Sequence, residues 1–88
     1  MKSSEILREA ARRVERGMAV SGCGAIAQAS GLLSQKANGL QEFERARGIF
    51  ARYLRQPNCT YWWPKEPEHG PRIIGLCLAA AIAESEGD

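Results

Sequence analysis

Residues 71–83 read PRIIGLCLAAAIA, and this run decides how the rest of the chain must fold. At about 100° per residue, its large side chains point to most sides of a helix. They are Ile73, Ile74, Leu78 and Ile82 on one side and Leu76 on another. A helix that is apolar on most faces has to be covered by other helices, so we expect it at the centre of the molecule. Its small stripe, Gly75, Ala79 and Ala83, predicts where a neighbouring helix approaches most closely.

An amphipathic helix is predicted at the start of the chain, after an N-cap at Ser3 or Ser4 and up to Gly17. Its apolar arc comprises Ile6, Leu7, Ala10, Ala11, Val14 and Met18. Its opposite arc comprises Glu5, Arg8, Glu9, Arg12, Arg13, Glu15 and Arg16. The arginines offer a docking face for an acidic partner, although a solvated helix surface is the favoured interpretation of such an arc.

A short helix is predicted between a cap at Ser21 and a glycine terminator at Gly31. Cys23 lies between two glycines near its start. A catalytic thiol needs a neighbouring base, and the chain has a single histidine, His69. We therefore favour a small buried cysteine at a tight helix contact over a nucleophile.

A third helix is predicted to open at residue 38 or 39, with acidic residues near its start and arginines near its end. Its apolar arc comprises Leu40, Phe43, Ala46, Ile49, Phe50, Tyr53 and Leu54. Arg47 falls inside this arc, so its guanidinium must reach along apolar neighbours or find an anionic partner. A salt bridge to Glu66, Glu68 or the acidic tail is favoured over a ligand contact.

Residues 56–70 break the helical pattern, because their three prolines exclude a continuous helix. This segment also contains Tyr61, Trp62 and Trp63. Consecutive side chains of an extended chain point to opposite sides, so the tryptophans are not expected in one pocket. We expect one to fill the core and the other to form a stacking platform or an oligomer contact. The acidic tail, residues 84–88, is expected to fray.

Polar and aromatic residues are predicted to gather at the N-terminal end of the last helix, provided that the proline-rich segment folds over the third and fourth helices. The candidate ligand-binding residues are Arg47, Tyr61, Trp62, Trp63, His69 and Arg72. Aromatic faces and guanidinium groups at a helix N-terminus suit a nucleotide-like ligand, since bases stack and phosphates accept N–H bonds.

Length and charge limit the class of protein. The 88 residues predict one domain, 1–88, and oligomerisation would add to a core of limited size. A net charge of +2 argues against a general nucleic-acid-binding protein. The longest apolar run is far shorter than the ~20 residues of a membrane-spanning helix, so a soluble cytoplasmic protein is expected. Its cysteines, Cys23, Cys59 and Cys77, are then expected to remain thiols.

Motifs for catalysis and for metal binding are weak. Cys59, His69 and Cys77 are potential zinc ligands, but their spacing lacks a C-x2-C or H-x3-H pair, and Cys77 is expected inside a packed helix. There is also no G-x-S-x-G sequence and no marked carboxylate pair. We therefore expect no metal, no cofactor and no enzyme activity.

Four segments carry a resemblance: ILREAARR (6–13), CGAIA (23–27), WWP (62–64) and RIIGLCLAAAIAE (72–84). Together they resemble small uncharacterised helical proteins encoded by bacteriophages and prophages. The likeness covers the two ends of the chain and misses residues 32–39. It implies a context rather than catalytic residues, because small phage accessory proteins often counter host defences. They do so by sequestering nucleotide immune signals or by binding a defence complex.

The sequence thus predicts an all-α protein, a compact bundle of three to four helices with a Pro/aromatic-rich loop before a central C-terminal hydrophobic helix. The preferred function is a non-enzymatic, phage-encoded binder that sequesters a nucleotide-type immune signal in the bacterial cytoplasm as a homo-oligomer. The alternative is a protein-binding inhibitor of a defence complex, anti-CRISPR-like, that uses the arginine face of the first helix or an exposed tryptophan. A structural phage accessory protein is the third possibility.

Overall fold

The computed structural model describes residues 2–34, 37–53 and 69–88, with the backbone alone at His69 and Pro71. This part of the chain forms four helices: α1 (Ser3–Glu15), α2 (Gly22–Ser30), α3 (Gly39–Tyr53) and α4 (His69–Ser85). The described residues contain no strand. The all-α bundle predicted from the sequence is therefore confirmed.

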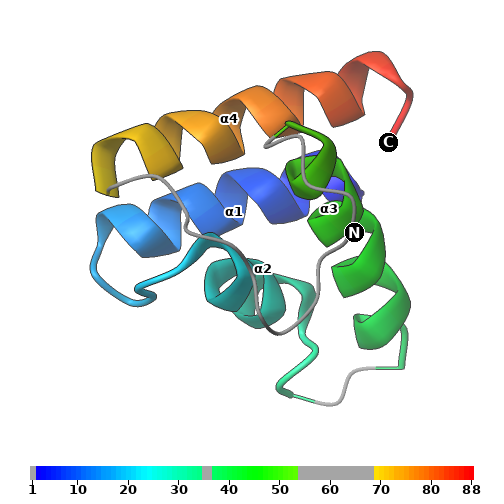
Figure 1. The fold of residues 1–88 in the computed structure, drawn as a ribbon. Coiled ribbons are helices and arrows are strands. Elements are labelled where there is room, and N and C mark those ends of the chain that lie inside the picture. Colours follow the sequence, from blue (N-terminus) through cyan, green and yellow to red (C-terminus); the bar gives the residue numbers. More distant parts are fainter. Residues whose placement is uncertain (1, 35–36, 54–68) are drawn as a thin grey trace.

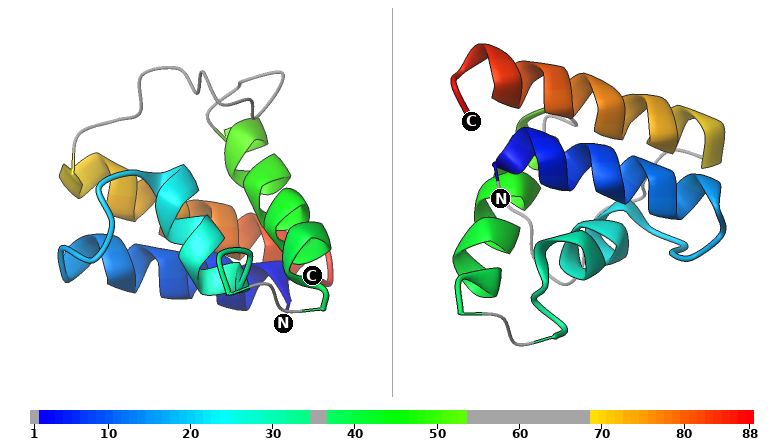
Figure 2. Two further views of the ribbon diagram at one scale, coloured as in Figure 1. Left: turned by 90° about the horizontal axis from the view of Figure 1, so that it is seen from below. Right: turned by 180° about the vertical axis from the view of Figure 1, so that it is seen from behind.

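Helix α1 occupies the centre of the bundle. Figure 1 and the views of Figure 2 show α1 and α4 side by side, with α2 on the other side of α1 and α3 crossing one end of the pair. Helix α1 packs against all three other helices, whereas α4 packs chiefly on α1, less on α3 and little on α2. The expectation that the last helix is the central one is therefore wrong.

The packing of α4 explains this difference. Its buried residues are Gly75, Leu76, Ala79, Ala80 and Ala83. A Cβ atom on Gly75 would lie 3.1 Å from Cε1 of Tyr53 and 3.6 Å from Cε1 of Phe50, both on α3. The small stripe is thus the surface of close approach, as the sequence predicts. Because α1 and α3 both pack on this side, the large side chains on the opposite side of α4 are left exposed; they are Ile74, Leu78 and Ile82.

The apolar arc of α1 is buried as predicted, from Ile6 and Leu7 to Val14. Met18 lies beyond the end of the helix and is 53% exposed. Gly17, with φ of 74°, follows the last turn and ends the helix. The start differs from the prediction, because the N-cap is Lys2, and its backbone N–H donates to the Glu5 carboxylate at 3.2 Å.

Ser3 and Ser4 are buried in the first turn, where they contact the acidic tail of the chain. Ser3 N–H and Ser3 Oγ donate to the two carboxylate oxygens of Asp88, at 3.2 and 2.9 Å. Ser4 N–H donates to the main-chain oxygen of Asp88 at 2.9 Å. An anion at a helix N-terminus satisfies amides that have no partner within the helix and interacts favourably with its dipole. Asp88 is therefore a cap for α1 that is supplied from the far end of the sequence.

A left-handed turn directs Asp88 back toward α1. Gly87 has φ of 82°, a conformation that favours glycine. Asp88 N–H donates to the Ala83 carbonyl and Gly87 N–H to the Glu84 carbonyl, which is the pairing of a Schellman motif. The expectation that residues 84–88 fray is therefore wrong, because the tail closes α4 and caps α1.

Helix α2 begins and ends where the sequence places it, and α3 begins where the sequence places it. Ser21 Oγ accepts a hydrogen bond from Gly24 N–H at 2.9 Å, and Gly31 ends α2 in the left-handed region with φ of 83°. Helix α3 begins at Gly39 and buries Phe43, Ala46, Ile49 and Phe50, whereas its first large residue, Leu40, is 58% exposed. The core has many small side chains: ten of the eighteen described core residues are alanines.

Candidate functional site

Arg47 is the best described of the predicted ligand-binding residues. It is half-buried on α3, and its guanidinium carbon lies 5.1 Å from the ring centroid of Phe43, one turn earlier on the same helix. This is a cation–π contact, in which the charge is held over an apolar ring. Arg47 thus follows one of the two alternatives predicted from its place in the apolar arc, because its side chain lies along an apolar neighbour. Glu66 and Glu68, proposed as its partners, lie outside the described residues.

Arg72 lies in the first turns of α4 and reaches another part of the bundle. Its Nη1 donates to the main-chain oxygen of Val20 at 2.5 Å, in the turn between α1 and α2. Arg72 therefore holds that turn against α4, while Arg47 lies over a ring of α3. Tyr61, Trp62 and Trp63 lie outside the described residues, as does the side chain of His69. The gathering of all six candidate residues thus stays a prediction.

The arginine face of α1 is largely neutralised within the chain. Arg12 and Arg13 both contact the carboxylate of Glu9, at 2.9 and 3.1 Å. Arg8 pairs with Glu84 of α4 at 2.5 Å. The hydrogen bond from Arg12 lowers the pKa of Glu9, and the hydrogen bond from Arg8 lowers the pKa of Glu84. Because two carboxylates offset the charge of these three arginines, the positive charge that this face offers to an acidic partner is reduced.

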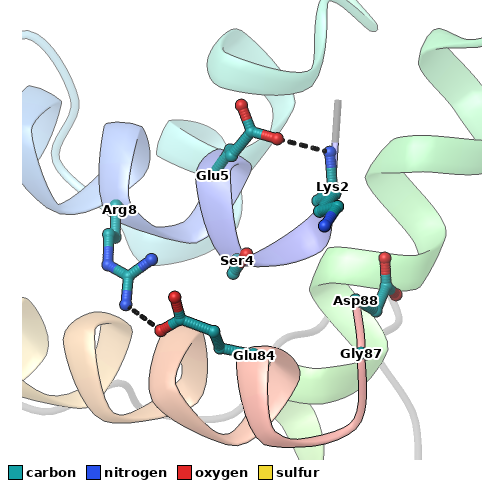
Figure 3. A pocket seen from close by; sticks show the side chains of 7 residues that line it. All are labelled: Lys2, Ser4, Glu5, Arg8, Glu84, Gly87 and Asp88. Atoms are coloured by element: carbon teal, nitrogen blue, oxygen red, sulfur yellow. Dashed lines mark hydrogen bonds and ion pairs between the residues drawn. The ribbon is translucent and has the colours of Figure 1, made fainter.

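A pocket of about 300 Å³ lies between the start of α1 and the end of α4. Figure 3 shows Arg8 and Glu84 reaching toward one another across it, and Glu5 turned toward the backbone of Lys2. A second, more open hollow lies between α3 and the tail, beside the ion pair of Arg52 with Glu86 at 2.7 Å. Each hollow contains an ion pair formed within the chain, Arg8 with Glu84 in the first and Arg52 with Glu86 in the second, and each is lined by charges of both signs.

The outer face of α4 is the most distinctive surface of the described part of the chain. We use this name for its exposed apolar residues, Ile74, Cys77, Leu78, Ala81 and Ile82. Its three large side chains are Ile74, Leu78 and Ile82, which are 60%, 46% and 36% exposed. They are spaced by four residues and therefore share one side of the helix.

The outer face of α4 carries no charge along its length, since the sequence from Ile73 to Ala83 is wholly uncharged. Charged groups border its C-terminal end on both sides. Arg8 pairs with Glu84 on the side of α1, and Arg52 pairs with Glu86 on the side of α3. An apolar centre with a polar border is the usual anatomy of a protein–protein interface. The surface is suited to a protein partner and unsuited to phosphate, which needs cations or exposed amides.

This surface could have been predicted from the sequence, but a helix that is apolar on most sides was expected to be covered all round. Ile74 and Leu78 lie away from the small stripe, whereas Leu76 lies beside it and is fully buried. Close helix packing needs small residues, so the side with glycine and alanine is the one that neighbours cover. Cys77, expected inside the packed helix, is accordingly exposed, whereas Cys23 is half-buried against the core.

The described residues show neither a metal-binding cluster nor a helix suited to span a membrane. Among the described residues, no three His, Cys, Asp or Glu side chains lie together in a way that could hold a metal ion. In the same part of the chain, no helix has both the length and the apolar character needed to cross a membrane.

Comparisons with known proteins were made at three levels. Protein-family models, curated proteins and solved structures all gave no significant match to this chain.

Proposed function

We propose that this protein is a non-enzymatic binding protein whose partner is another protein, held on the outer face of α4. The observation that carries the proposal is the exposure of Ile74, Leu78 and Ile82 on one side of a helix whose other side is packed. Large exposed apolar patches are costly in water and commonly mark interaction sites. The partner that fits is an apolar helix or groove of low net charge, because the flanking charges are already paired.

The biological setting in this proposal comes from the resemblance to phage and prophage proteins. In that setting the protein acts in the bacterial cytoplasm as an inhibitor that binds a component of a defence complex. The arginine face of α1 is a weaker docking surface than the outer face of α4, because Arg8, Arg12 and Arg13 have carboxylate partners within the chain.

Matched variants test the proposal. Leu78→Glu places a charge at the centre of the outer face of α4, and Leu40→Glu makes the same change at an exposed leucine of α3. Both proteins would be used to capture partners from lysate of a bacterial host. We expect a host protein that is retained by the wild type and by Leu40→Glu and is lost with Leu78→Glu. Retention of every captured protein by Leu78→Glu would contradict the proposal.

A second candidate function is the sequestration of a nucleotide-type immune signal. The observation that favours it is the half-buried guanidinium of Arg47 over the ring of Phe43, a cation placed beside an aromatic surface. The other residues that the sequence predicts for this site are Tyr61, Trp62, Trp63, His69 and Arg72.

This candidate is tested by mass spectrometry of small molecules released by heat from the purified protein, together with melting curves in the presence of cyclic nucleotides. Arg47→Met should abolish any rise in melting temperature. Arg52→Met, at an exposed arginine of the same helix, should preserve it. If no nucleotide is recovered and none raises the melting temperature, sequestration is wrong.

A further inference from the structure

We infer that the outer face of α4 is also an interface between two copies of this chain, with their α4 helices packed antiparallel about a two-fold axis near Leu78. The inference rests on the proposed function in one respect, that this face binds protein. It adds the identity of one partner, a second copy. Such a dimer and a host protein would compete for the same residues.

The spacing of the large side chains is self-complementary. Ile74 and Ile82 lie four residues before and four residues after Leu78. When an identical helix is laid antiparallel with its Leu78 at the same level, Ile74 of each copy faces Ile82 of the other. This reciprocity is the defining property of a two-fold interface, in which residue i contacts j and j contacts i. Beside these residues, Cys77 and Ala81 are small enough to allow helices to approach at the usual distance of about 8–10 Å.

The charges around the face favour a partner with the same properties. Arg8 with Glu84 and Arg52 with Glu86 form ion pairs within one chain. The C-terminal border of the face is therefore close to neutral, and it does not select a strongly acidic or basic partner. A second copy has an equally uncharged apolar centre and an equally balanced border, so no charge is left buried without a partner.

The composition of the core gives the dimer an energetic basis. Alanines make up ten of the eighteen described core residues, whereas three of the larger aliphatic side chains of the chain lie on the outer face of α4. Alanine buries little apolar area, and a domain of this length has limited area to bury. Covering the outer face of α4 on two chains at once removes from water apolar area that the single chain leaves exposed.

The mass in solution tests the inference directly. Light scattering on eluting wild-type protein should give twice the chain mass of 9.6 kDa at high micromolar concentration and should fall toward the chain mass on dilution. Leu78→Glu and Ile74→Glu should elute as single chains at every concentration, with unchanged helical circular dichroism. Leu40→Glu should behave like the wild type. A wild type that stays a single chain at millimolar concentration, or a dimer that survives both α4 substitutions, overturns the inference.

Cysteine cross-linking gives a second readout that also reports the antiparallel arrangement. In a Cys23→Ser, Cys59→Ser protein, Cys77 remains as the one cysteine, and the two copies of Cys77 lie close to the axis on the same side of the helix pair. A short bismaleimide should join two chains in this protein and fail to join them when Leu78→Glu is added. Failure to cross-link a species that has the mass of a dimer overturns the proposed arrangement.

The two proposals fail separately. A single-chain protein that loses a host partner with Leu78→Glu overturns the dimer and leaves the proposed function standing. A dimer that is lost with Leu78→Glu supports the dimer whether or not a host protein is found. If host lysate then offers no partner to the wild type at concentrations where it is a single chain, the proposed function is overturned while the dimer stands.

Discussion

Replacing Asp88 by alanine should destabilise the protein far more than an exposed position in an acidic tail would suggest. The substitution removes two hydrogen bonds at the start of α1, to Ser3 N–H at 3.2 Å and to Ser3 Oγ at 2.9 Å. Loss of a helix N-cap costs about 1 kcal/mol. Ser3 is buried, so leaving its hydroxyl without an acceptor costs about 1 kcal/mol more. We expect a loss of about 2 kcal/mol in the free energy of unfolding.

Thermal unfolding followed by circular dichroism measures this loss, which corresponds to a fall of about 10 °C in melting temperature for a domain of this size. Glu86→Ala is the matched control, because Glu86 lies in the same tail and forms an exposed ion pair with Arg52. Such pairs contribute at most about 1 kcal/mol and often nothing measurable. If the Asp88 and Glu86 variants melt at the same temperature, Asp88 does not cap α1. Non-additivity of Asp88→Ala with Ser3→Ala would identify the hydrogen-bonded pair as the cause.

The same contact predicts a dependence on pH. The hydrogen bond from the Ser3 hydroxyl, aided by the Ser3 amide, lowers the pKa of the Asp88 carboxyl in the folded protein. A carboxyl whose pKa is lower in the folded state contributes stability above its unfolded pKa of about 3.9. That contribution is lost as the pH falls through the folded pKa. The difference in free energy of unfolding between wild type and Asp88→Ala should therefore have its largest value at neutral pH. It should decrease steadily below a pH of about 4.

Four further substitutions test the packing and the caps by the same melting assay. Gly75→Leu should destabilise the protein by about 1–3 kcal/mol, because even a Cβ atom at this position would lie 3.1 Å from Tyr53. Gly48→Ala should stabilise the protein by up to about 1 kcal/mol, because a Cβ atom there would have no neighbour within 4 Å. A Gly75→Leu protein as stable as wild type would show that the close approach is not needed. Leu76→Ala should cost about 2–5 kcal/mol, since this side chain is fully buried, and a loss below about 1 kcal/mol would contradict its place in the core. Ser21→Ala should cost about 1 kcal/mol through loss of the α2 cap, and no change would refute that role.

Local rules predicted most of the helices correctly. Ser21 and Gly31 define α2 because a cap and a left-handed terminator depend only on neighbouring residues. The apolar arc of α1 and most of that of α3 are buried for the same reason, since helical periodicity fixes which residues share a side. Ser3 and Ser4 were misassigned as caps because the real cap partner of α1 is Asp88, which no local pattern connects to them.

Tertiary placement was harder to predict than the helices. Apolar content indicated that residues 71–83 would be covered, but coverage depends on how many helices are available and on how closely they approach. Of the helices in the described residues, α1 and α3 pack most on α4, and they bury its small stripe together with Leu76. Of the predicted ligand site, Arg47 has the environment that its position in the helix implies, and Arg72 contacts a turn that lies 52 residues earlier in the sequence. That long-range contact has no sequence signature.

The pairing of α1 with α4 has a consequence for how the chain folds during synthesis. The most extensive helix contact joins the first and last helices, and Asp88 completes the hydrogen bonds of the first turn of α1. Contacts between such distant segments form slowly, because a long loop must close before they stabilise the chain. The N-terminal helix therefore cannot reach its native surroundings while α4 is still inside the ribosome. Folding of this domain should be a single late event that follows completion of α4, and not a helix-by-helix process.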